Sequence, residues 1–148
     1  MARTAVNSNL YLVPVDGFSQ AVEVPPGAGM LLVSGLTSRD SDGTIVSDGD
    51  VGGQMRQILK QLAVILAERS LSLDDVVRVR TYTRDIQSWP AVEEVFRESF
   101  GVVWPASTFV EVTRLYDPRQ LVEMEAVAVI RADGRHPSGG SREQGDRT

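Results

Sequence analysis

The segment WPASTFVEV, Trp104 to Val112, has the regular alternation of a β-strand and is the key to the fold. Pro105 cannot donate a hydrogen bond to a neighbouring strand, so it belongs at a strand's first residue or on an edge strand. The alternation predicts one face with Ser107, Phe109 and Glu111, and an opposite face whose two valines suit a core. The face with the hydroxyl, the ring and the carboxylate is a working site, a solvated surface, or a site that has lost a key residue.

Periodic patterns on both sides of this segment predict two helices and further strands. Apolar residues recur at helical spacing from Asp50 to Glu68 and again from Trp89 to Phe100. Alternating or continuous apolar runs predict strands at 19–24, 30–36, 77–84 and 121–130. The first two of these are predicted to form a hairpin with a longer loop, and a further short strand is proposed at 44–46.

The predicted fold class is α+β, a mixed sheet with two helices packed on one face, because two helices cover only one side of such a sheet. Three strands place polar or aromatic side chains on the face predicted to lie away from the helices: Arg78, Arg80, Tyr82, Ser107, Phe109, Glu111, Glu123 and Glu125. A face that mixes paired charges with apolar groups suits burial between subunits, so we expect a homo-oligomer whose sheets meet. The alternative is an exposed sheet with ordinary cross-strand ion pairs.

Composition excludes several classes of function. The net charge of -5 argues against nucleic-acid binding, and the absence of cysteine removes thiolate nucleophiles and cysteine-based metal sites. The single histidine, His136, lies in a polar segment. We expect one domain over residues 1–131 and a disordered tail over 132–148. No segment has the pattern of a signal peptide or a membrane span, so a cytoplasmic protein without a membrane partner is expected.

Eight segments resemble, in order and spacing, the RidA (YjgF/L-PSP) family of reactive-intermediate deaminases: FSQAV, LLVSGL, DGTIV, GGQMRQILKQLAVILAE, SLDDVVRVRTYTRD, VEEVFRESF, PASTFVEVTRL and VEMEAVAV. The resemblance implies a chorismate-mutase-like fold assembled as a homotrimer, with small-molecule pockets in the clefts between subunits. Family deaminases hydrolyse 2-imino or enamino acids to 2-oxo acids and ammonia, without a metal or an organic cofactor.

The resemblance also assigns site residues, and several differ from the family pattern. In the family an arginine directly after PA holds the substrate carboxylate, and that position here is Ser107. The small residue or cysteine two positions later is Phe109, the tyrosine before SQ is Phe18, and a helix position that is often asparagine is Glu93. The matching positions that are retained are Ser34, Gly35 and Glu123, the last corresponding to the glutamate that positions the attacking water.

Loss of the arginine has a predictable cost. A charge-assisted bidentate contact contributes enough that its removal weakens carboxylate binding by about a hundredfold or more. We therefore predict a divergent member that hydrolyses an uncharged or bulkier imine or enamine, with Glu123 directing water and Ser107 donating a hydrogen bond. The alternative is a non-catalytic binding or regulatory trimer that kept the scaffold.

Three arginines are close to the site in strand order. Arg78, Arg80 and Arg114 either replace the missing guanidinium or, as we favour, pair with glutamates at the subunit interface. Ribonuclease activity, named for some relatives, is supported neither by the acidic composition nor by a domain without histidine.

Overall fold

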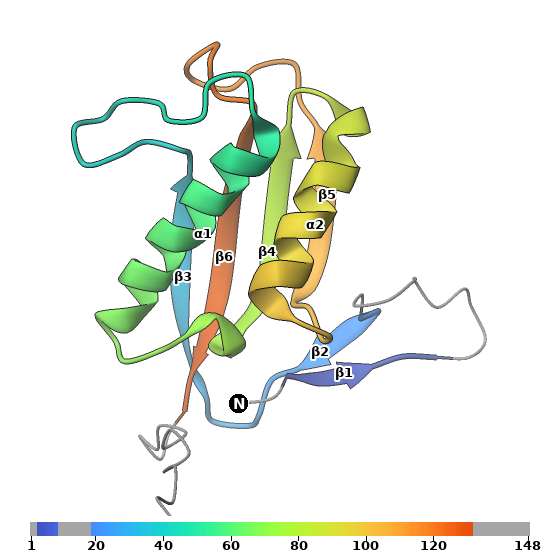
Figure 1. Cartoon of the computed structure of the whole chain (residues 1–148). Helices are drawn as coiled ribbons and strands as arrows, with labels where there is room; N and C mark the ends of the chain where they lie inside the picture. The colour runs from blue at the N-terminus through green and yellow to red at the C-terminus, as the bar shows by residue number, and fades with distance from the viewer. Residues whose placement is uncertain (1–2, 9–18, 132–148) are drawn as a thin grey trace, which may run out of the picture.

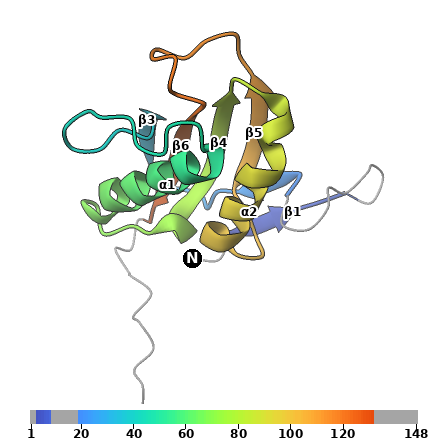
Figure 2. The same cartoon turned by 45° about the horizontal axis from the view of Figure 1, so that its top comes forward.

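The computed structural model describes residues 3–8 and 19–131. Within them, a four-stranded sheet has the order β3–β6–β4–β5, in which only β4 and β5 run parallel. The strands are β3 (Gly29–Leu36), β4 (Val76–Thr83), β5 (Ala106–Glu111) and β6 (Val122–Ile130). Helices α1 (Val51–Ala67) and α2 (Trp89–Phe100) cover the same face of this sheet (Figures 1 and 2). The predicted mixed α+β architecture is confirmed.

The start of α1 is fixed by a side-chain cap. Asp50 has extended backbone geometry, and its Oδ1 accepts a hydrogen bond from the amide of Gly53 at 3.0 Å, which satisfies one of the helix's free N–H groups. The predicted helical spacing is confirmed by the residues that α1 buries, which include Met55, Ile58, Leu62 and Leu66. This apolar face packs on β3 and β6, so the helix covers that half of the sheet.

An aromatic cluster lies under α2. Trp104 is fully buried, its Nε1 donates to the carbonyl of Gly101 at 2.9 Å, and its ring contacts Phe96 with centroids 5.7 Å apart. Trp89, at the first residue of α2, lies 6.2 Å from Phe96 in the same edge-to-face arrangement. The cluster holds α2 against the start of β5, the strand from which the sequence interpretation began.

The central strands have the predicted side-chain directions. Val79, Thr81 and Thr83 are buried beneath the helices, whereas Arg78 and Arg80 point to the opposite, open face. A register irregularity between Val76 and Arg78 allows two successive valines at the start of β4 to be buried.

The predicted N-terminal hairpin is wrong. Strand β2 (Ala21–Glu23) pairs antiparallel with β1 (Thr4–Val6), a strand that the sequence interpretation missed, and β3 pairs instead with β6. The segment proposed as a strand at 44–46 contributes only an isolated bridge between Ile45 and Arg39. The short β1–β2 pair lies below the main sheet, beside the N-terminal end of the described chain (Figure 1).

Arg3, at the beginning of the described chain, is 7% exposed and fastens the N-terminal segment to the domain. Its guanidinium donates to the carbonyls of Leu73 and Val76, at 2.8 and 3.0 Å, and of Val103, at 2.9 and 2.6 Å. A longer bond of 3.4 Å reaches Phe100, whose ring lies 5.4 Å from the guanidinium carbon. One side chain therefore joins the segments that lead into β4 and β5.

Phe18 and the predicted tail over 132–148 lie outside the described residues. Among the described residues, no helix combines the length and the apolar character that crossing a membrane requires.

Candidate functional site

Glu123 lies on the open face of the sheet, beside the retained glycine. It pairs across the sheet with Tyr82, and its half-buried side chain reaches over to β3. There its Oε1 occupies the space next to Gly35 where a larger residue would place its Cβ. Ser34 precedes this glycine and is exposed, at the point where the β3–β6 register becomes irregular. The structure thus brings together the retained residues Ser34, Gly35 and Glu123.

The neighbouring carboxylate, Glu125, is already engaged. Arg80 Nη1 donates to its Oε1 at 3.0 Å, and the Tyr82 hydroxyl donates to its Oε2 at 3.3 Å. Arg80 therefore pairs with a glutamate of its own chain, whereas the predicted pairing at a subunit interface stays a prediction. Glu123, by contrast, has no hydrogen bond or ion pair within residues 3–8 and 19–131. Of the two glutamates, Glu123 is the one whose oxygens remain available to water or a ligand.

The predicted direction of β5 is wrong. In the parallel register Ser107, Phe109 and Glu111 lie opposite Val79, Thr81 and Thr83, which face the helices. Residues opposite one another on adjacent strands point to the same side of a sheet. The three β5 side chains therefore lie on the helix-covered face, and the residues between them turn to the open face, where Val110 is 39% exposed.

Ser107 sits at the edge of the aromatic cluster. Two positions further along the same face, the ring of Phe109 contacts Trp89 with centroids 4.9 Å apart. The Ser107 hydroxyl is buried and has no hydrogen-bond partner among the described residues, as is also true of the Thr81 hydroxyl on the adjacent strand. A pair of buried hydroxyls without partners is costly and marks a place where a ligand or water would be stabilised.

Glu93 lies on helix α2, on the helix-covered side of the sheet to which Ser107 and Phe109 also point. It lies one helical turn after Trp89 on α2, and its Oε1 accepts a hydrogen bond from Arg97 at 2.9 Å. Sequence reasoning missed Trp89 and Thr81 as site residues. The spacing of Trp89 and Glu93 along the helix was an available signal, whereas the position of Thr81 beside Phe109 depends on strand register.

The candidate residues therefore form two groups. Ser34, Gly35 and Glu123 lie on the open face at β3 and β6, and Glu93, Ser107 and Phe109 lie on the helix-covered face at α2 and β5. Because β4 and the thickness of the sheet separate them, the two groups cannot contact one small ligand within a single chain.

The carboxylate of Glu111 belongs to neither group. Its Oε2 accepts a hydrogen bond from the backbone N–H of Ile86 at 2.8 Å.

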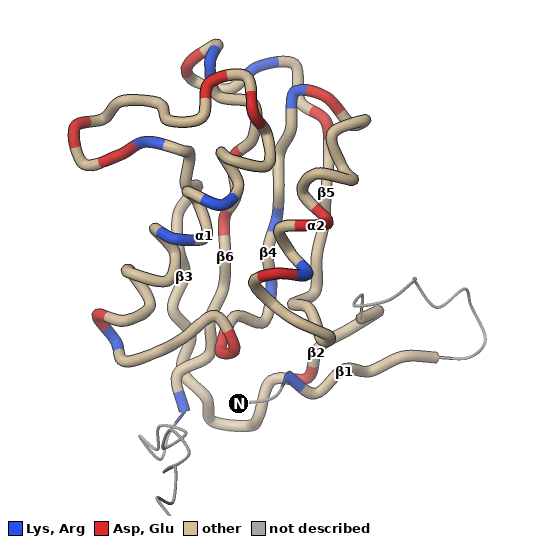
Figure 3. The backbone as a smooth tube through the Cα atoms, viewed as in Figure 1, with Lys and Arg blue, Asp and Glu red and all other residues tan. Residues whose placement is uncertain are grey.

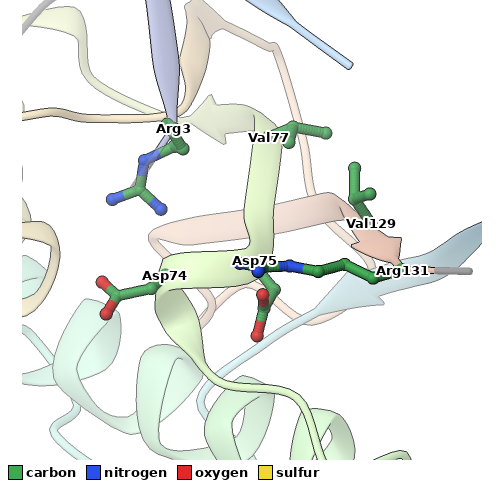
Figure 4. A pocket seen from close by; sticks show the side chains of 6 residues that line it. All are labelled: Arg3, Asp74, Asp75, Val77, Val129 and Arg131. Carbon is green, nitrogen blue, oxygen red and sulfur yellow. The ribbon is translucent and has the colours of Figure 1, made fainter. Parts of the chain in front are cut away.

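A second charged cluster lies where the two ends of the described chain approach each other, and it is lined by Arg3, Asp74, Asp75, Val77, Val129 and Arg131. In Figure 4 the side chain of Arg131 extends across to Asp75. Burial lowers the pKa of the Arg3 guanidinium, while the charges of Asp74 and Asp75 oppose this shift. These side chains leave no room for a water molecule, so we interpret the cluster as a structural junction. Within the described chain, no three histidine or acidic side chains are grouped as a metal site requires.

Residues 10–130 match the model of the endoribonuclease L-PSP family. The chain belongs to this family. The resemblance to the RidA (YjgF/L-PSP) proteins is confirmed, and the retained Gly35–Glu123 contact lies within the matched region.

Individual members of the L-PSP family show how far the similarity extends. A RutC family protein of Pyrococcus abyssi is 33% identical over 129 residues, which cover 86% of this chain and 98% of the relative. The 3-aminoacrylate deaminase RutC of Acinetobacter baylyi is 33% identical over 101 residues, covering 68% and 79% respectively. The crystal structure of YyfB from Yersinia pestis, a Rid family protein of unknown function, superposes with a TM-score of 0.78 at 30% identity and covers 88% of this chain and 100% of YyfB.

Proposed function

We propose that this L-PSP family member is a hydrolase that deaminates an uncharged or bulky imine or enamine in clefts between the subunits of a homotrimer. The observation that carries the proposal is the contact of Glu123 with Gly35, in which the carboxylate keeps its oxygens unpaired within the described chain. The name of the Acinetobacter baylyi relative, a 3-aminoacrylate deaminase, supports the same class of reaction.

The proposed reaction needs a positioned water and no metal or organic cofactor. Glu123 accepts a hydrogen bond from water, and the water oxygen adds to the imine carbon as the carboxylate takes its proton. The carboxyl group returns that proton to the nitrogen, which gives a neutral carbinolamine. The carbon–nitrogen bond then breaks as the proton of the new hydroxyl moves to the nitrogen, so that ammonia leaves and the carbonyl product contains the oxygen of the water.

The preference for an uncharged substrate follows from Ser107. A serine hydroxyl can donate one hydrogen bond, whereas a guanidinium offers a planar pair of donors and a full charge. Beside Ser107, the Trp89–Phe109 contact supplies an aromatic wall that favours an apolar or planar substituent. This position is therefore matched to a neutral group.

Assembly from several copies is supported by two features of the chain. The retained and the altered site residues lie on opposite faces, which is the arrangement expected if each cleft takes one group from each of two neighbours. On the open face, Met30 is 62% exposed and Leu32 is 73% exposed, although both are apolar. Adjacent exposed apolar side chains favour burial against another copy of the chain.

The experiment that tests the proposal measures ammonia release from freshly generated imines by the full chain. We expect Glu123→Gln to lower kcat by about a hundredfold or more, since the amide cannot accept the proton from water. Glu98→Gln is the matched control, because Glu98 is exposed and pairs with Arg56 on the outer surface of the helices. Equal rates for wild type and Glu123→Gln would remove the carboxylate from the mechanism.

Gly35→Ala tests the position of the carboxylate without removing it. The added methyl group would occupy the space of Glu123 Oε1, so the side chain must move away from its present place. We expect kcat to fall by roughly tenfold, a typical cost of misplacing a reacting group, with little change in KM. A variant with unchanged kcat would show that the Gly35–Glu123 contact is not needed for the reaction.

The second candidate function is a non-catalytic trimer that binds an apolar small molecule. The observation that favours it is the aromatic wall of Trp89 and Phe109 at the position where the family places a charged anchor. This reading predicts ligand binding that survives in Glu123→Gln, together with no ammonia release by the wild type. The two candidates therefore give opposite results in the same pair of assays.

A further inference from the structure

Buried glutamines join the chain that leaves β3 to the chain that enters β6, at the end of the domain where the two loops lie side by side (Figure 1). Gln54 of α1 is fully buried and holds the backbone on both sides of Gln120. Its Oε1 accepts the N–H of Leu121 at 2.8 Å, and its Nε2 donates to the carbonyl of Arg119 at 2.8 Å. Gln120, itself 2% exposed, then donates from Nε2 to the Thr37 hydroxyl at 3.1 Å. This last bond links the two chain segments directly.

The Thr37 end of the link is held in the same way. Gln61, about two helical turns further along α1, donates from Nε2 to the carbonyls of Thr37 and Arg39 at 2.8 and 2.7 Å. Charged segments of both loops surround the link (Figure 3), and among them Arg39 Nη2 lies 3.9 Å from Asp117 Oδ2. The amide of Asp117 donates to Gln120 Oε1 at 3.0 Å. Side-chain amides from one helix thus fix both ends of the Gln120–Thr37 bond.

The link lies next to the Gly35–Glu123 contact. Gly35 precedes Thr37 by two residues, and Glu123 follows Gln120 by three. The β3–β6 register is irregular in the stretch that contains Gly35 and resumes only at the last residue of β3. Backbone pairing therefore fixes Gly35 weakly on this side, and the Gln120–Thr37 bond is the side-chain contact that closes the gap between the two strands.

We propose that Gln120 is a positioning residue, which acts through Thr37 to keep the Glu123 carboxylate against Gly35. This inference rests on the proposed deaminase function and adds to it residues that touch neither the water nor the substrate. A displacement of about 1 Å in a reacting group can lower a rate by about a hundredfold, so a bond that sets the spacing of β3 and β6 affects kcat. Gln120 is buried within one chain, so contact with another copy does not replace the bond.

The test replaces Thr37, because valine and serine separate its hydroxyl from its shape. Thr37→Val removes the acceptor of the Gln120 amide, whereas Thr37→Ser keeps it. We expect Thr37→Val to lower kcat for ammonia release by roughly tenfold with little change in KM, and Thr37→Ser to stay close to wild type. Gln120→Met should match Thr37→Val, and the double variant should lose no more than either single variant. Thr44→Val is the matched control, because Thr44 is an exposed threonine of the same loop.

NMR of the full chain labelled with 15N-glycine distinguishes failure of this inference from failure of the proposed function. The Gly35 amide signal is expected to shift in Glu123→Gln, because the carboxylate oxygen lies beside that glycine. The same signal should move in Thr37→Val and remain in place in Thr37→Ser and Thr44→Val. These shifts in a protein that releases no ammonia would support the positioning of the carboxylate and contradict the deaminase function.

Two results overturn the positioning role of Gln120. The first is a Thr37→Val variant whose kcat and Gly35 signal are those of the wild type. The second is a Thr37→Ser variant that is as impaired as Thr37→Val, since the loss would then come from packing and not from the hydrogen bond.

Discussion

Replacing Arg3 by methionine is expected to lower the free energy of unfolding by about 3 kcal/mol. Methionine keeps much of the apolar stem but removes every donor, so the buried carbonyls of Val76 and Phe100 and the part-buried carbonyl of Val103 lose the hydrogen bonds from Arg3. The Leu73 carbonyl keeps its hydrogen bond from the backbone N–H of Val76. Each buried acceptor without a hydrogen bond costs about 1–3 kcal/mol, although such costs are not additive. Urea unfolding measures the change, and the protein concentration is kept the same for all variants because the stability of the proposed oligomer would depend on it.

Two further variants separate the donors of Arg3 from its charge. Arg3→Lys keeps the charge but has a single ammonium, which cannot reach all the carbonyls, so an intermediate loss is expected. Arg69→Met removes an exposed arginine and should change stability by no more than about 0.5 kcal/mol. An Arg3→Met variant as stable as Arg69→Met would contradict the assignment of Arg3 as the residue that fastens the N-terminal segment.

The second large effect is a gain of activity. The double variant Ser107→Arg/Phe109→Ala is expected to hydrolyse 2-imino acids about a hundredfold faster, in kcat/KM, than Phe109→Ala alone. The arginine restores a bidentate carboxylate anchor on the helix-covered face of β5. The alanine removes the ring that contacts Trp89 at 4.9 Å and so opens space for the longer side chain.

The comparison with Phe109→Ala is the necessary control, because removing a half-buried ring also costs stability. Folding of both variants is checked by urea unfolding before the rates are compared. A folded double variant with no gain would show that the cleft differs from the family pattern at more positions than Ser107 and Phe109.

The sequence predicted the alternation of side chains along the strands better than it predicted which face of the sheet each set of side chains occupies. On β4, from Arg78 to Thr83, the alternation of arginine with valine and threonine placed each side chain on the correct face. On β5 the period was also correct, but Val110 and Val112 suggested a core face that the structure does not have. The phase is set by the parallel register with β4 and by the packing of Phe109 on Trp89, and neither is a local property of the strand.

The N-terminal pairing shows the same limit. The alternation at 19–24 indicated a strand, but its partner is β1, a segment of three residues whose pattern is too short to predict. The role of Arg3 could not be predicted either, because a single arginine near the N-terminus does not indicate that its donors will reach carbonyls about 70 to 100 positions away. The retained Gly35 and Glu123 were identified by resemblance to the family, and their contact required the β3–β6 pairing.

The central claim is that this chain keeps the L-PSP scaffold and its water-positioning glutamate but has exchanged a carboxylate anchor for a neutral one at Ser107. The most direct test measures ammonia release by the wild type from the imine group of two freshly generated compounds. One is a 2-imino acid, and the other is the uncharged 2-imino amide with the same side chain. We predict that the amide is hydrolysed with a kcat/KM about tenfold or more above that of the acid. A faster reaction with the acid, or no ammonia from either compound, would contradict the account.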